Sequence, residues 1–213
     1  MIDFESEQTA VRQQGDRQTC VAFAVSAAHE WAQTGTEILA PEDALWAAHQ
    51  QMPSQFNGDE TSVNYALAGL DSHQHASEAA WPYGNPDWRS GRPPEADNLA
   101  NRRALPRWRR LDRTTIKSIR GELQTDRAVV LTVGVVLAAW RRPDGFIDAP
   151  AGQKIPGTHA VSVVGISEDD DHERTLKIKN SWGERWGQRG YGTMSGRYLD
   201  AYAVCAHTIE RIK

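Results

Sequence analysis

Cysteine is scarce in this sequence, and its scarcity limits what can stabilise the fold. Only two of the 213 residues, Cys20 and Cys205, are cysteines. One pair cannot supply the framework of several disulfides on which small secreted domains depend. The fold must therefore depend on a hydrophobic core, and 213 residues are enough chain to bury one. The low cysteine content favours a reducing compartment.

The chain also lacks a long apolar run and a strong charge of one sign. Its most apolar stretch, residues 129–140, is interrupted by Thr132 and Gly134 and is too short to cross a bilayer. The formal net charge is −4 at pH 7, so no overall positive field attracts nucleic acid. The first residues, MIDFESEQTAV, lack the basic and then apolar order of a signal peptide. We therefore expect neither a membrane nor nucleic acid as a partner, and a cytoplasmic location. Export by a route that needs no signal peptide is left open.

The pattern of apolar residues divides the chain into a helical front and a strand-rich back. Helical spacing predicts helices over residues 19–34, from Pro41 to before Pro53, and over 61–70. A fourth helix is expected after Thr115, which can cap it. Strands are predicted by four segments rich in valine, isoleucine and threonine: AVVLTVGVV, AVSVVGIS, TLKIKNSW and AVCAHTIERI. Helices followed by strands indicate the α+β class.

Two charged segments carry no clear chemistry. Residues 81–113 are rich in proline and arginine, and we interpret them as a solvent-exposed loop segment that crosses the surface. The alternative is a docking patch for an acidic partner. The acidic run at 168–171 lacks the ligand spacing of a known Ca²⁺ loop. The histidines show no spacing typical of a metal site. No metal and no cofactor is predicted.

Cys20 is the first candidate for chemistry. It stands at the start of the first predicted helix, directly after Thr19 and a polar loop. The positive end of a helix dipole lowers the pKa of a thiol and enriches the nucleophilic thiolate. A lone cysteine is more often a buried structural residue, so the case for a nucleophile depends on the residues that accompany it.

Three further residues favour the catalytic interpretation. His159, where a polar turn enters an apolar strand, can act as the base and then as the acid. Asn180, at the exit of the strand TLKIK, can accept a hydrogen bond from the histidine and fix its ring. Gln14, six residues before Cys20, can donate its side-chain N–H beside the Cys20 backbone N–H to an oxyanion.

These residues stand in three blocks that resemble the papain-like cysteine peptidases, the family that includes the cathepsins. VRQQGDRQTCVAF is similar to the family's glutamine-to-cysteine block, THAVSVVGI to its histidine block and KIKNSWGERWGQRGYG to its asparagine block. The blocks follow in the family's order across almost the whole chain. The resemblance implies that Cys20, His159 and Asn180 form a catalytic triad, with Gln14 in the oxyanion hole.

The same resemblance implies an architecture. The chain would be a single catalytic domain over residues 1–213, with a helical lobe at about 10–110 and a mainly β lobe at about 111–213. The papain-like fold places the active-site cleft between the helical lobe and an antiparallel, barrel-like β lobe. Trp182 would lie over the histidine–asparagine pair and shield its hydrogen bond from water. Residues expected to contact substrate are Asn57, Gly58, Asp59, Thr158, Ala160, Trp182 and Glu210.

Several positions depart from the family's pattern. Asp59 stands where a second consecutive glycine is usual, which alters the close approach of a peptide backbone. Arg17 replaces a disulfide cysteine, and the usual partner of Cys205 falls at Ala151, so Cys205 is expected to be free. Glu210 aligns with the floor of a substrate pocket, where its carboxylate would pair with an arginine of the substrate. The alternative for Glu210 is an exposed acidic residue on a late strand.

The function expected from these features is that of a thiol-dependent endopeptidase acting on a protein or peptide substrate. Two alternatives stay open: a protein deamidase or acyl or peptidyl transferase with the same triad, and a catalytically silent peptide-binding module. Only 13 residues precede Gln14, too few for the family's inhibitory propeptide. We therefore expect either a trimmed domain or control by location, by substrate supply or by a partner such as a protein inhibitor or regulator.

Overall fold

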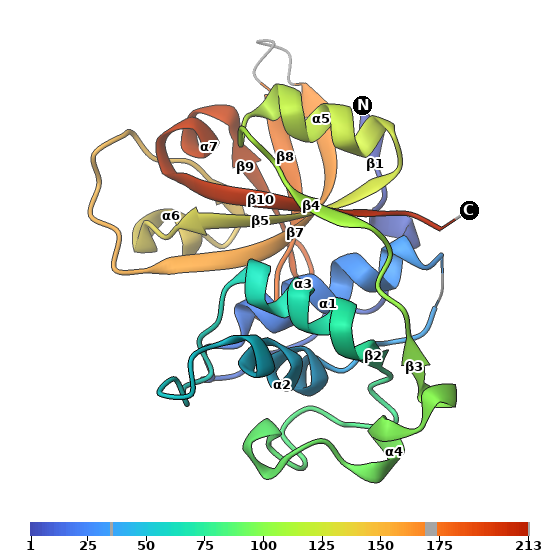
Figure 1. The fold of residues 1–213 in the computed structure, drawn as a ribbon. Coiled ribbons are helices and arrows are strands. Elements are labelled where there is room, and N and C mark those ends of the chain that lie inside the picture. The colour runs from blue at the N-terminus through green and yellow to red at the C-terminus, as the bar shows by residue number, and fades with distance from the viewer. Residues whose placement is uncertain (35, 169–173, 213) are drawn as a thin grey trace.

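A computed structural model describes residues 1–34, 36–168 and 174–212. Its first three α-helices lie together below a large sheet, and its last three lie beside the strands of that sheet (Figure 1). Residues 169–171 of the acidic run lie outside the described residues. The helices are α1 (Cys20–Ala32), α2 (Pro41–Gln51), α3 (Val63–His73), α4 (Pro94–Asp97), α5 (Ile116–Gln124), α6 (Leu137–Trp140) and α7 (Gly196–Tyr202), with short 3-10 helices η1 (Glu5–Glu7), η2 (Trp88–Ser90) and η3 (Leu99–Asn101).

The strands form one large sheet and one small ribbon. They are β1 (Ile2–Asp3), β2 (His75–Ala76), β3 (Arg102–Arg103), β4 (Trp108–Arg110), β5 (Arg127–Gly134), β6 (Phe146–Ile147), β7 (Thr158–Glu168), β8 (Arg174–Lys179), β9 (Tyr191–Ser195) and β10 (Ala203–Glu210). The large sheet has the order β4-β10-β5-β7-β8-β9-β6, with β1 added to β7. The β6–β9 pair is parallel, whereas the other pairs of this sheet are antiparallel. Helices and this sheet confirm the α+β class.

Local sequence signals account for where the helices begin. Pro41 is the first residue of α2, where its missing N–H is not needed. Ser62 caps α3 by accepting from the Tyr65 N–H, so α3 begins slightly later than its apolar spacing predicts. Thr115 caps α5 as expected, in a reciprocal capping box with Ser118.

Helix α1 is the centre of the helical lobe. Almost every residue from Val21 to Ala32 is buried, because α1 packs on β7 and β5 on one side and on α2 and α3 on the other. Helices α2 and α3 approach closely at Gly69, where an added Cβ would come 2.1 Å from the carbonyl oxygen of Ala47. Only glycine fits there.

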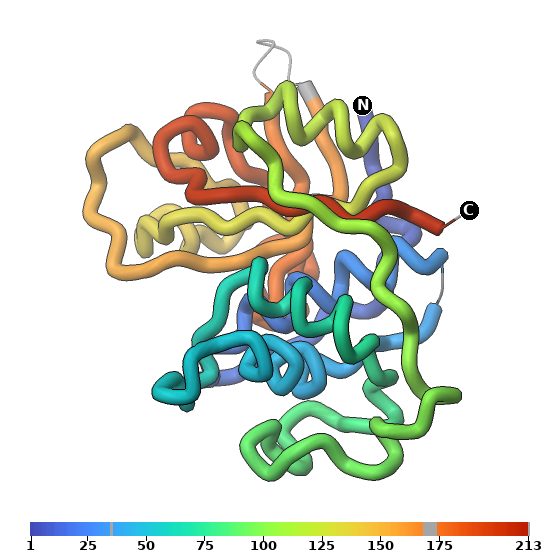
Figure 2. The backbone as a smooth tube through the Cα atoms, viewed as in Figure 1, coloured from blue at the N-terminus to red at the C-terminus, as the bar shows by residue number. Residues whose placement is uncertain are grey.

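Both ends of the chain cross between the lobes (Figure 2). The N-terminal residues pair with β7, and the chain then reaches the helical lobe, where Arg12 forms an ion pair with the buried Glu30. Near the other end, the Ile212 N–H donates to the carbonyl of Ala32 in α1. The termini therefore hold the two lobes together.

The proline- and arginine-rich segment is irregular, as predicted, with only short elements. Several of its arginines are paired within the protein: Arg102 with Asp97, Arg103 with Glu37 and Arg109 with Glu122. Among the described residues, no helix is both long and apolar enough to cross a membrane.

Candidate active site

Cys20 and His159 come from different lobes and line the same cleft. Cys20 is the first residue of α1, and His159 is the second residue of β7. The cleft has a volume of about 970 Å³. Its helical wall consists of residues 14–18, Cys20, Val21 and residues 60–64, and its β wall of Arg110, Thr132, Val135, residues 156–160, Trp182, Val204, Cys205 and His207.

A hydrogen bond of 2.7 Å joins His159 Nε2 to Asn180 Oδ1, the pairing expected from the sequence. The same Oδ1 accepts from the backbone N–H of Ser181 at 2.8 Å, which identifies it as the amide oxygen. Nε2 of His159 must therefore carry the proton, and Nδ1 is left unprotonated. This tautomer leaves a nitrogen able to accept a proton from a thiol.

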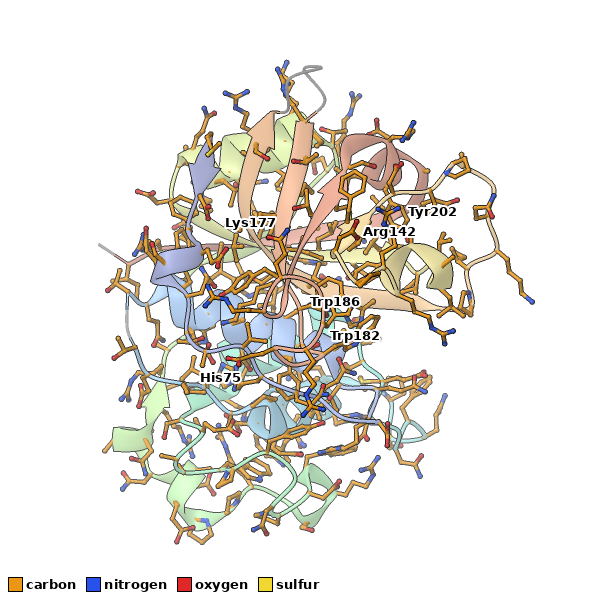
Figure 3. All side chains as sticks on the ribbon, turned by 180° about the vertical axis from the view of Figure 1, so that it is seen from behind. His75, Arg142, Lys177, Trp182, Trp186 and Tyr202 are labelled. Atoms are coloured by element: carbon orange, nitrogen blue, oxygen red, sulfur yellow. The ribbon has the colours of Figure 1, made fainter. Side chains whose placement is uncertain are left out.

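Aromatic rings shield the histidine–asparagine pair. The ring of Trp182 lies 4.7 Å from that of His159, centroid to centroid, as the resemblance implies. Trp140 was not predicted, because no motif surrounds it; it meets the His159 ring edge-on at 5.2 Å. Trp186 donates from Nε1 to the Trp140 carbonyl, so three indoles pack together here. Figure 3 shows two of them, Trp182 and Trp186, side by side.

The environment shifts both titratable partners toward their neutral forms. Burial raises the pKa of the Cys20 thiol, against the opposing effect of the backbone at Ala160 and Val21. Burial also lowers the pKa of His159 to about 4, despite the hydrogen bond that His159 donates to Asn180. The expected lowering of the thiol pKa by the helix dipole is therefore wrong for the free protein, because desolvation of the thiolate is the larger effect.

Gln14 lies where it can donate to an oxyanion. Its Nε2 donates to the carbonyl of Arg17 at 2.7 Å, and its Oε1 accepts from the Ser181 hydroxyl at 2.6 Å. The second N–H of the amide is left for a ligand. Because Cys20 begins α1, its backbone N–H has no intrahelical acceptor and is available as the other donor.

The predicted substrate contacts divide into two groups. Thr158, Ala160 and Trp182 line the cleft, whereas Asn57, Gly58 and Asp59 are not among the described residues that line it. Asp59 is instead paired with Arg17, which itself lines the cleft. The next residues along the chain, 60–64, form the wall in their place and were not predicted as substrate contacts.

Glu210 also lies elsewhere. Its carboxylate is 3.5 Å from the Arg127 guanidinium and is 44% exposed. The described cleft lining includes Val204, Cys205 and His207 from β10, but not Glu210. From Cys205 to Glu210 the register of β10 against β5 is continuous, and Glu210 pairs with Arg127 at the end of the strand. The predicted pocket role of Glu210 is therefore wrong, because the residue lies beyond the part of β10 that lines the cleft.

Two residues of the cleft lining, His207 and Asn64, join the lobes. His207 Nε2 is 2.7 Å from Oδ1 of Asn64 on α3, which joins β10 to the helical wall. Cys205 and Cys20 are both free thiols, as expected. In the described part of the chain, no group of three or more histidine, cysteine or acidic side chains is arranged to hold a metal ion.

A thiol at a helix start, a base held by an amide and two available N–H donors are the parts of a candidate nucleophilic acyl-transfer site. The chain belongs to the papain family: the family model described as "Papain family cysteine protease" matches residues 2–209. This match, with the observed architecture, confirms the papain-like fold.

Similar proteins agree with this assignment. Cathepsin R of Mus musculus is 30% identical over 203 residues, 86% of this chain and 55% of that protein. A peptidase C1-like protein of Acanthamoeba polyphaga mimivirus is 26% identical over 204 residues, 87% of this chain and 64% of that protein. This chain therefore spans less than two thirds of the length of either relative. The crystal structure of xylellain, a cysteine protease from Xylella fastidiosa, superposes with a TM-score of 0.80 at 22% identity, covering 100% of this chain and 86% of that one.

Proposed function

We propose that this protein is a thiol-dependent endopeptidase that hydrolyses peptide bonds through a thioester intermediate. The observation that carries the proposal is the hydrogen bond of 2.7 Å between His159 Nε2 and Asn180 Oδ1, beside Cys20 in one cleft. It leaves Nδ1 of His159 as the acceptor for the thiol proton. An orienting amide of this kind is needed for general-base work and not for peptide binding alone.

In the proposed reaction, Cys20 Sγ attacks the carbonyl carbon of the substrate while its proton passes to His159 Nδ1. The carbonyl oxygen becomes an oxyanion, which the free N–H of Gln14 and the Cys20 backbone N–H stabilise. The tetrahedral species collapses, the C–N bond breaks, and His159 returns the proton to the leaving amine. Water, deprotonated by His159, then attacks the thioester and releases the carboxylic acid and the free thiol.

The test is a panel of fluorogenic peptides assayed with a reducing agent, comparing wild type with Cys20→Ala and Cys20→Ser. We expect both variants to lose cleavage while keeping the circular dichroism and melting temperature of wild type. Cysteine variants that still cleave would overturn the assignment. A wild type that cleaves nothing would overturn endopeptidase activity.

A protein deamidase or transferase would use the same acyl-enzyme and differ only in what enters the cleft and what attacks the thioester. Mass spectrometry of an incubated protein substrate separates the reactions, because peptidase action gives two fragments and deamidation leaves one intact chain. A silent peptide-binding module would show neither product. We favour the peptidase because the family model that matches residues 2–209 is described as a cysteine protease family.

We also propose that the protein works in a reducing cytoplasm on protein or peptide substrates. Free Cys20 and Cys205 are compatible with that environment, and the described fold is held without a disulfide between them. A protein inhibitor or regulator that fills the cleft is a further proposed partner.

A further inference from the structure

We propose that Arg17 is the positioning residue for the oxyanion donor Gln14, anchored by a cluster of carboxylates in the helical lobe. This role rests on the proposed acyl-transfer function, because it concerns how well the donor is aligned. With Cys20 and Cys205 both free, no disulfide between them holds the loop of residues 14–20. Polar contacts must therefore fix it.

The backbone of Arg17 touches the donor directly. Its carbonyl accepts from Gln14 Nε2 at 2.7 Å, which uses one of the two amide hydrogens and sets the direction of the other. Gln14 is buried, with only 7% of the residue's surface exposed, so water does not compete freely for this hydrogen bond. Any movement of the Arg17 carbonyl therefore turns the N–H that faces the substrate.

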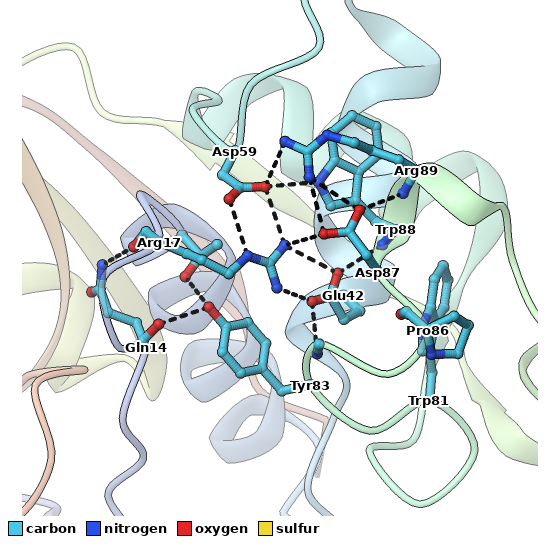
Figure 4. Close-up of polar contacts among 12 residues, drawn as sticks. Gln14, Arg17, Glu42, Asp59, Trp81, Tyr83, Pro86, Asp87, Trp88 and Arg89 are labelled. Atoms are coloured by element: carbon cyan, nitrogen blue, oxygen red, sulfur yellow. Dashed lines mark hydrogen bonds and ion pairs between the residues drawn. The ribbon is translucent and has the colours of Figure 1, made fainter.

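The side chain of Arg17 holds that carbonyl in place. Its guanidinium binds Asp59 through two parallel hydrogen bonds, Nε to Oδ2 at 3.0 Å and the terminal nitrogen to Oδ1 at 3.1 Å (Figure 4). It also forms an ion pair with Glu42 and lies 3.4 Å from an oxygen of Asp87. A planar guanidinium that binds carboxylates through several of its N–H groups is held in one orientation, whereas the ammonium group of a lysine would not be.

The carboxylates of the cluster are themselves fixed. Glu42 is fully buried and accepts from the backbone N–H groups of Gly84 at 2.8 Å and Trp88 at 3.0 Å. Burial raises the pKa of Asp59, but hydrogen bonds from Arg17 and the Trp88 indole outweigh it and lower the pKa to about 2. Asp59 thus stays charged throughout the pH range in which an imidazole can serve as a base.

Tyr83 supplies a second tether to the same loop. Its hydroxyl donates to the Gln14 carbonyl at 2.8 Å and lies 2.8 Å from the hydroxyl of Thr19, the residue before Cys20. Its ring lies beneath the Arg17 guanidinium, 4.9 Å from centroid to carbon. The loop is therefore held at Gln14, Arg17 and Thr19 from one side.

The experiment compares Arg17→Met with Arg89→Met in the full chain. Arg89 also pairs with Asp59 and Asp87 and stacks on Trp88. Arg89→Met is therefore a matched control, because it too removes one cationic side chain from the cluster. We expect Arg17→Met to lower kcat by about 10- to 100-fold with KM within about twofold, because misplacing a catalytic donor by about 1 Å costs up to about 100-fold. Arg89→Met should keep the wild-type kcat.

Two probes of Cys20 distinguish alignment of the donor from general damage. A peptide aldehyde adds to the thiol, and its carbonyl oxygen takes up the charge at the oxyanion site, so Arg17→Met should weaken its binding in parallel with kcat. Iodoacetamide alkylates the thiol by displacing iodide and forms no oxyanion, so its rate should stay within about twofold of wild type. Arg17→Lys, which keeps the charge but not the two-point contact, should give an intermediate kcat with the same alkylation rate.

An unchanged kcat in Arg17→Met would overturn the role, as would an equal loss of kcat and alkylation. If Arg17→Met fails to fold, Arg17→Lys decides by the same criteria. Wild-type protein that neither cleaves peptides nor binds the aldehyde would overturn the proposed function itself, and with it the role of Arg17. Wild-type activity with an unaffected Arg17→Met overturns the role of Arg17 alone.

Discussion

The hydroxyl of Ser181 donates a hydrogen bond of 2.6 Å to Oε1 of Gln14, across the boundary between the two lobes. The backbone N–H of the same serine donates to Asn180 Oδ1. One residue of the β lobe thus holds both the amide that orients the base and the amide that serves the oxyanion. The relative position of the lobes is thereby coupled to the geometry of catalysis.

Ser181→Ala should therefore lower kcat by about tenfold without changing KM by more than about twofold. The variant releases Oε1 of Gln14 but keeps the backbone contact to Asn180, so its effect stays below the 10²- to 10³-fold expected for losing a whole oxyanion donor. Steady-state kinetics on a cleaved peptide measures it. Ser167→Ala, which removes a hydroxyl contact to Thr175 at the other end of β7, is the control and should behave as wild type. Equal activity of the two variants would contradict the coupling.

Acid should destabilise the fold through two histidines in the helical core. His29 and His75 stack on one another with their Nδ1 atoms 3.0 Å apart, and both are completely buried. Burial lowers the pKa of His29 to about 4, and burial together with the charge of His29 lowers that of His75 well below its usual value. The unfolded chain takes up these protons near pH 6.5, whereas the folded chain does not, so stability falls as the pH falls from about 6.5 toward 4.

Proton uptake by His29 in the unfolded chain should by itself lower the free energy of unfolding by about 2 kcal/mol between pH 7.5 and pH 5. Urea unfolding at several pH values measures this, and His29→Gln should give a shallower dependence on pH because one of the two groups is gone. A wild type equally stable at pH 7.5 and pH 5 would show that these imidazoles do not govern acid stability. The expected behaviour suits a protein that works near neutral pH.

Glu210→Gln should leave the preference between arginine- and leucine-containing substrates unchanged. The carboxylate pairs with Arg127 on β5 and is absent from the described lining of the cleft. A matched pair of fluorogenic peptides that differ only at the residue two before the scissile bond measures the ratio of kcat/KM. A selective loss on the arginine peptide would restore the pocket role that the sequence comparison suggested.

The helices, and the residues that meet in the candidate site, were predictable because their signals are local. Pro41 and Thr115 mark helix starts through the geometry of a single turn, and the strands follow from runs of β-branched residues. Strand β8 ends at Lys179, directly before Asn180, the residue predicted to hold the histidine. The triplet Asn180-Ser181-Trp182 therefore lies just outside the sheet, at the candidate site. The block around Asn180 indicated the residue, but only the fold showed that Ser181 acts on Gln14.

By itself, the sequence determined the α+β class, the papain-like order of its blocks and the identity of Gln14, Cys20, His159 and Asn180. Only the tertiary structure decided which acidic residues face the cleft. Asp59 turns to Arg17, 42 positions away, and Glu210 to Arg127, 83 positions away. The physical reason is that a carboxylate binds the nearest guanidinium in space, and nearness in space across such separations depends on how the whole chain folds.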